Sequence, residues 1–193
     1  NSALRISRNP WDTTRVPGGS SSGSSVAVAS GMAPASIATD TGGSIRQPAS
    51  LTGVVGFKGT YGSVSRYGVI PMASSLDTMG VLSRTVRDAH LVWDAMQGHD
   101  PLDATSLDGR IEVSPEIWNR KDLKGVKIGL PKEYFGDGIE AGTREVIEQA
   151  KKTLTDLGAE LIEISLPTTD YALAAYYIIV PSEVSSNLAR FDG

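Results

Sequence analysis

The chain has 193 residues, of which 40% are hydrophobic and 21% are charged, and its net charge is -4. This length and composition fit one folded domain and exclude wholesale disorder. With no cysteine and no basic stripe, the sequence excludes disulfides, thiolate catalysis, Cys-ligated zinc and unaided binding to a nucleic-acid backbone.

The first 50 residues alternate between loops and short apolar segments. Residues 1–17 lack a sustained period and are predicted to be loop. Residues 18–25 have the composition of a flexible linker, but they run directly into small apolar residues. We therefore expect Ser24 or Ser25 to cap a short buried helix that ends at Gly31.

Next comes a predicted strand over residues 36–39, which delivers Asp40 and the glycines that follow it. Residues 44–50 are expected to start a helix, and residues 54–57 are expected to form a strand. Residues 59–75 are rich in glycine and proline, which indicates irregular backbone.

The remaining elements follow from hydrophobic periodicity and from start and stop signals. They are a helix over 85–97 with Thr85 as its cap, a loop over 99–116, a strand over 126–130, a helix over 143–157, a strand over 160–166 and a helix over 170–190. Pro181 is expected to kink or split the last helix. Strands that alternate with helices indicate an α/β fold with a largely covered sheet.

No membrane association is predicted. The longest apolar stretch, residues 171–180, has ten residues. A membrane-spanning helix needs about 20. With two histidines and no cysteine, metal sites are poorly supplied, and we expect neither a metal nor a cofactor in this chain.

The turn at residues 40–44, Asp-Thr-Gly-Gly-Ser, is the strongest candidate site. Gly42 and Gly43 leave successive backbone N–H groups uncovered beside Ser44, between a predicted strand and a predicted helix. If Ser44 attacks a carbonyl group, these N–H groups are placed to bind the oxygen that becomes negative. The turn alone fits equally simple roles, because Ser44 is also a suitable helix cap.

A serine nucleophile needs a base, and the histidines fit poorly. His90 lies within a predicted helix and His99 in a predicted loop. A neutral lysine is the alternative base, acting directly or through a second hydroxyl group. Lys58 belongs to the segment after the predicted strand, and we interpret it as structural or solvated.

Residues 18–50, GGSSSGSSVAVASGMAPASIATDTGGSIRQPAS, resemble the signature of the amidase signature family. The match joins two glycine-serine turns, with Ser20 and Ser44 24 positions apart, and continues through residues 53–58. The resemblance implies an amidase-signature fold, in which helices cover a mixed β-sheet on both faces. It also implies that residues 1–193 are part of a single amidase domain, truncated at both ends.

The resemblance further implies a Ser-(cis)Ser-Lys mechanism. Ser44 is the nucleophile that forms an acyl ester, and Ser20, in a cis peptide, relays its proton. The backbone at three residues of the second turn binds the oxyanion and the substrate: Thr41, Gly42 and Gly43. Asp40 and Arg46 support this turn. In the family the lysine base lies well upstream, so this stretch alone is expected to be nearly inactive.

Three segments resemble one branch of the family, the glutaminase subunits of the glutamyl-tRNA(Gln) or aspartyl-tRNA(Asn) amidotransferases. They are residues 5–19, 61–80 and 174–193. The chain departs from the pattern at Gly59 and Val81, where proline is common. The implied reaction releases ammonia from glutamine. Implied partners are subunits B and C of a cytoplasmic heterotrimer, of which the first uses ATP and magnesium to amidate a misacylated tRNA and the second is small.

Four other functions are alternatives. A stand-alone amidase that hydrolyses small amides would use the same chemistry without partners. A phosphate-binding protein would need the P-loop lysine, which neither turn supplies. An aspartic protease would need a second carboxylate motif, and only one Asp-Thr-Gly occurs. A non-catalytic scaffold would keep the fold without using Ser44.

Overall fold

The computed structural model describes residues 4–191. Within them the chain forms two compact units, one made of residues 4–111 and 178–191 and the other of residues 112–177. Both turns of the candidate site belong to the first unit. The two units are described separately below.

The first unit is built on a three-stranded antiparallel sheet in the order β1-β3-β2. Its strands are β1 (Ala35–Asp40), β2 (Val55–Lys58) and β3 (Thr78–Ser83). The strands β1 and β2 confirm the predicted ones to within one residue. The central strand β3 was not predicted at all. Asp40 pairs with Thr78 at the end of the β1-β3 ladder, so β3 fixes where the candidate turn leaves the sheet.

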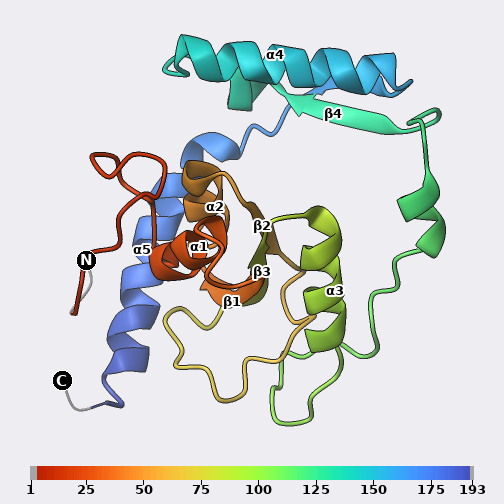
Figure 1. Ribbon diagram of the computed structural model, residues 1–193. Helices are drawn as coiled ribbons and strands as arrows, with labels where there is room; N and C mark the ends of the chain where they lie inside the picture. The colour runs from red at the N-terminus through yellow and green to blue at the C-terminus, as the bar shows by residue number, and fades with distance from the viewer. Residues whose placement is uncertain (1–3, 192–193) are drawn as a thin grey trace. The chain divides into compact units, whose positions relative to one another are not determined.

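Helices α1 (Ser22–Ala29) and α2 (Arg46–Thr52) cover one face of this sheet (Figure 1). Their core cluster with the sheet consists of Val28, Ile45, Ala49 and Leu82. Gly56 on β2 allows α2 to come close, because a Cβ atom there would lie 2.5 Å from the Cβ of Ala49. This packing places the start of α2 against the end of β1, where the candidate turn lies.

Helix α3 (Val86–Met96) covers the opposite face, since alternate strand residues point to opposite sides (Figure 1). Trp93 of α3 makes an edge-to-face contact with Phe57, with ring centroids 5.3 Å apart. Phe57 in turn pairs with Val81 across the ladder. The predicted cap is confirmed, because the Thr85 side chain accepts a hydrogen bond from the N–H of Asp88.

The second unit holds a two-stranded parallel sheet of β4 (Lys127–Pro131) and β5 (Glu160–Ile164). Between them lie the short 3-10 helix η2 (Lys132–Phe135) and α4 (Ala141–Asp156), and η1 (Pro115–Asn119) precedes β4. A parallel pair needs a crossover connection, and α4 is that connection. The predicted strand, helix and strand are therefore confirmed here, with ends shifted by up to two residues.

Two sequence expectations need correction. The first helix begins at Ser22, so neither Ser24 nor Ser25 is its cap, and no side chain caps it among the described residues. The last helix, α5 (Thr169–Leu188), is one continuous helix with Pro181 inside it. Pro181 removes one backbone donor, which is a local loss in a 20-residue helix and does not split it.

Candidate active site

Asp40 organises the candidate turn from its buried position at the end of β1. Its side chain is 0% exposed. One oxygen, Oδ1, accepts hydrogen bonds from the N–H of Gly43 at 2.8 Å and from Arg46 Nη2 at 2.9 Å. The other, Oδ2, accepts from the N–H groups of Ile45 and Arg46 and from Arg46 Nε. One carboxylate thus fixes the backbone on both sides of Ser44.

These contacts also set the charge of Asp40. Burial by itself raises the pKa of the carboxyl group, but the hydrogen bonds from Arg46, Ile45 and Gly43 outweigh it, and the pKa is lowered from its ordinary value. The same hydrogen bonds raise the pKa of Arg46. Asp40 and Arg46 therefore form an ion pair with one buried partner and one half-exposed partner.

Ser44 lies in the turn before α2, and its side chain does not cap that helix. The N-cap position is occupied by Ile45, and no side chain in the described part of the chain donates or accepts a capping hydrogen bond there. Gly43 has a φ angle of 126°, which favours glycine. The simple interpretation of Ser44 as a helix cap is therefore wrong. The half-buried hydroxyl of Ser44 has no capping role to explain its presence.

The first turn is joined to the second by backbone and side-chain hydrogen bonds. The N–H of Ser21 donates to the carbonyl oxygen of Ser44 at 3.1 Å. The N–H of Gly19 donates to Gln47 Oε1 at 3.0 Å. The peptide bond between Gly19 and Ser20 is cis, as the resemblance implies. Two turns that are 24 positions apart in sequence are thus held side by side.

A pocket of about 500 Å³ opens at the first turn, and Ser20 is one of its lining residues. Its walls come from the N-terminal segment and from the start of α1: Ile6, Ser7, Val16, Pro17, Gly18, Gly19, Ser22 and Gly23. Gly18 is needed for close packing as well, because a Cβ atom there would lie 2.8 Å from the Cα of Pro48. Ser20 is exposed and remains accessible within the first unit.

The other candidate bases stay outside these hydrogen bonds. The Nζ of Lys58 donates to the neighbouring carbonyl of Gly59 at 3.0 Å. His99 lies 3.5 Å from Asp108 in the loop after α3, and the ring of His90 lies beside Trp93 on α3. None of the three has a recorded contact with Ser20 or Ser44 in the described residues.

Several supporting residues were not found from sequence. Asp77 accepts a hydrogen bond of 2.5 Å from Thr41 Oγ1. The buried Asn9 donates to the carbonyl of Leu51 at 2.8 Å, and so ties the N-terminal segment to α2. Gln47 receives the N–H of Gly19, as described above. Each contact joins residues 28 or more positions apart, and no local spacing rule predicts such contacts.

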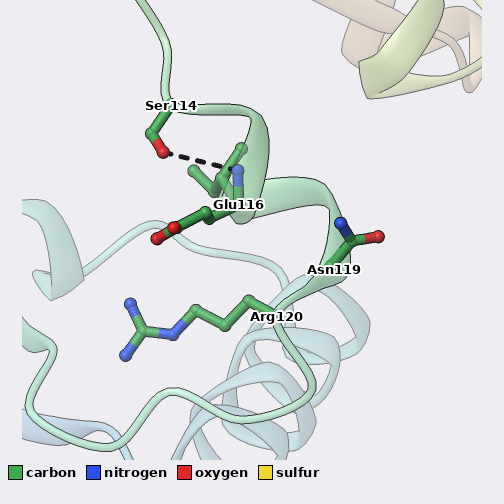
Figure 2. Close-up of a pocket in the computed structure, with 5 residues that line it drawn as sticks. Ser114, Glu116, Asn119 and Arg120 are labelled. Carbon is green, nitrogen blue, oxygen red and sulfur yellow. Dashed lines mark hydrogen bonds between the residues drawn. The ribbon is translucent and has the colours of Figure 1, made fainter.

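A second pocket, of about 510 Å³, lies on the second unit and shares no residue with the two turns. Figure 2 shows Ser114, Glu116, Asn119 and Arg120 around it, with the Ser114 hydroxyl accepting from the N–H of Glu116. Arg120 already donates to the carbonyl oxygens of Asp122 and Lys124. Its side chains are exposed, and we assign no function to this surface.

The model of the family described as Amidase matches residues 1–193. The chain belongs to the amidase family. Among curated relatives of this amidase are proteins named as the A subunits of glutamyl-tRNA(Gln) amidotransferase. That of Persephonella marina is 53% identical and that of Carboxydothermus hydrogenoformans 56%, each over the whole chain. The amidase chain spans 40% of the length of each of these relatives.

Solved structures confirm the amidase-signature α/β fold. The structure of the same glutamyl-tRNA(Gln) amidotransferase subunit from Thermotoga maritima matches all of this chain with a TM-score of 0.91 at 47% identity. The chain covers 42% of that protein. Native peptide amidase from Stenotrophomonas maltophilia matches 95% of the chain, and 38% of its own length is covered, with a TM-score of 0.80 at 37% identity. Within residues 4–191, no helix has both the length and the apolarity to span a membrane.

Proposed function

We propose that the full-length protein hydrolyses the side-chain amide of glutamine and supplies the ammonia to a tRNA-dependent amidotransferase. The observation that supports this most is the joining of the two serine turns, in which Ser21 bonds to the carbonyl of Ser44 and the Gly19–Ser20 peptide bond is cis. A helix cap or a phosphate loop would not need the two turns to be joined in this way.

In the proposed reaction, Ser44 Oγ attacks the amide carbon of glutamine while Ser20 accepts its proton. A lysine from the part of the protein upstream of this chain is the base that receives this proton from Ser20. The carbon–nitrogen bond then breaks, the proton passes back to the nitrogen, and ammonia leaves a glutamyl ester on Ser44. Water attacks the ester and releases glutamate, which regenerates the serine.

The negative oxygen of each tetrahedral intermediate needs donors that are already in place. The backbone N–H groups of Thr41 and Gly42 are the proposed donors, with that of Ser44. The N–H of Gly43 donates to Asp40, so its observed role is to hold the turn. The contacts of Asp40 and Arg46 keep this backbone fixed and support their predicted role. No metal or cofactor takes part in the proposed chemistry of this chain.

The choice of glutamine and tRNA rests on the relatives. Eight curated relatives, at 53–56% identity, have the same name, that of the A subunit of glutamyl-tRNA(Gln) amidotransferase. By this likeness the partners are subunits B and C, and the first of them uses ATP and magnesium on a misacylated tRNA in the cytoplasm. The complex is then a ligase, and residues 1–193 alone are inactive because the lysine base lies outside them.

We expect the full-length protein, assembled with subunits B and C, to release ammonia from glutamine and to amidate misacylated glutamyl-tRNA. The measurement compares ammonia release from glutamine with release from a simple aliphatic amide, alongside amide formation on the tRNA. Efficient hydrolysis of the simple amide by the protein alone, without binding to the ATP-using partner and without tRNA amidation, would replace this proposal with a stand-alone amidase.

A further inference from the structure

Thr41, the first residue after Asp40, makes a side-chain contact that the proposed reaction does not use. Its hydroxyl donates to Asp77 Oδ1 at 2.5 Å, across 36 positions of sequence. Asp77 is 7% exposed. An ionised carboxylate only accepts hydrogen bonds, so the hydroxyl proton of Thr41 is directed at Asp77. Hydrogen bonds to a charged acceptor are shorter and stronger than neutral ones.

The carboxylate of Asp77 is itself held in place. Its second oxygen, Oδ2, accepts from the N–H of Met72 at 2.8 Å and from the N–H of Ala73 at 3.0 Å. The N–H of Asp77 donates back to the carbonyl of Ala73 at 2.8 Å. Both oxygens therefore have partners, and the side chain is fixed with Oδ1 toward Thr41.

The loop that holds Asp77 is anchored to the C-terminal part of α5. Asn187 donates from Nδ2 to the carbonyl of Met72 and to the hydroxyl of Ser74, each at 3.1 Å. The carboxylate of Glu183 accepts the N–H of Ser75 at 2.9 Å. Asn187 is 4% exposed, so this anchor is part of the packed first unit.

We propose that Asp77 is a positioning residue for the oxyanion-binding turn. It touches no substrate. Asp40 holds the turn from the Gly43 side, and Asp77 holds it from the Thr41 side, so the Thr41 and Gly42 N–H groups are oriented between two fixed carboxylates. Preorganised donors act on the transition state more than on the bound substrate. Loss of the Thr41 contact should therefore lower kcat and change KM little. This inference rests on the proposed function.

The cleanest test replaces Thr41 with valine in the full-length protein assembled with its partners. Thr41→Val keeps the shape of the side chain and leaves the bonds from Met72 and Ala73 to Asp77 intact. We expect kcat for glutamine hydrolysis to fall about 10- to 100-fold, with KM changed less than about threefold, as the loss of a hydrogen bond to a charged group implies. Thr41→Ser keeps the hydroxyl group and is expected to recover most of the loss.

Two further variants separate positioning from stability. Thr105 Oγ1 donates to Asp103 Oδ1 at 2.8 Å, which is a matched threonine–aspartate contact elsewhere in the first unit. Thr105→Val should leave kcat within about twofold. In a double-mutant cycle, Asp77→Ala combined with Thr41→Val should lower kcat no further than Asp77→Ala alone.

The outcomes are distinguishable from failure of the proposed function. If the unmodified protein hydrolyses glutamine and Thr41→Val keeps its kcat, or if Thr41→Ser is as impaired as Thr41→Val, the positioning role of Asp77 is overturned. If the unmodified protein hydrolyses only a simple amide, the proposed function fails and the same series is measured on that amide. An unmodified protein that hydrolyses neither overturns both.

Discussion

Replacing Ser44 with alanine in the full-length, assembled protein is expected to lower kcat for glutamine hydrolysis by about 10⁴- to 10⁶-fold, the range seen when a serine nucleophile is removed from a catalytic triad. The hydroxyl of Ser44 is the attacking group in the proposed reaction, and nothing else in the turn can form the ester. The measurement is steady-state ammonia release from glutamine.

Two comparisons make the Ser44 result specific. Ser50 is exposed on α2 and its hydroxyl donates to the carbonyl of Gln47 at 2.8 Å, so Ser50→Ala is expected to leave kcat within about twofold. Ammonium salts supplied in place of glutamine should restore tRNA amidation by the Ser44→Ala enzyme, because the amidation step needs only ammonia. Undiminished glutamine hydrolysis by Ser44→Ala would favour the non-catalytic scaffold.

The second large effect is expected for Asp40→Asn. The amide nitrogen of asparagine would face the three donors that Oδ2 now accepts, two N–H groups of the backbone and Arg46 Nε. Breaking a buried ion pair by removing one partner costs about 3–5 kcal/mol. Arg46 is half exposed, so we expect about 3 kcal/mol of lost unfolding free energy, with kcat lowered at least about 100-fold because the turn around Ser44 loses its anchor.

The pH dependence of stability gives an independent measure of the same contact. The folded pKa of Asp40 is lowered, so its contribution to stability is fully present above the unfolded pKa, near ~4, and is lost as pH falls through the folded pKa. Urea unfolding of the full-length protein between about pH 7 and pH 2 should show less acid destabilisation for Asp40→Asn than for the unmodified protein.

Asp12→Asn is the matched control for Asp40. Asp12 also has a lowered pKa and also pairs with an arginine, Arg15, but this pair lies on the surface. Surface pairs contribute little, so Asp12→Asn should leave both kcat and the unfolding free energy nearly unchanged. Equal effects of the two substitutions would show that Asp40 acts through general charge and not through its contacts with the turn.

The sequence predicted most helices and strands because their signals are local. The helix α3 has a threonine cap, an acidic first turn and an apolar stripe, and its start and its cap were both predicted correctly. Strand β3 was missed for the opposite reason. Five of its six residues are buried, including residues on both faces, and Gly80 interrupts its apolar run, so it has no alternation to detect.

The candidate site divides in the same way. The two serine turns could be predicted, because glycine and serine at fixed spacing form a continuous motif. Asp77 could not be predicted, since its contact with Thr41 depends on β3 returning alongside β1, and that pairing is visible only in three dimensions. Gln47 belonged to the motif, but its contact with Gly19 depends on the packing of the first turn against α2.

The central claim is that Ser44 forms the covalent intermediate, and acid-quenched peptide mass spectrometry tests it most directly. The full-length, assembled enzyme is mixed with glutamine, quenched within one turnover, digested and sequenced by fragmentation. We predict a glutamyl ester on Ser44, absent from the Ser44→Ala enzyme and present at full yield in the Ser50→Ala enzyme. A glutamyl adduct on any other residue would contradict the account.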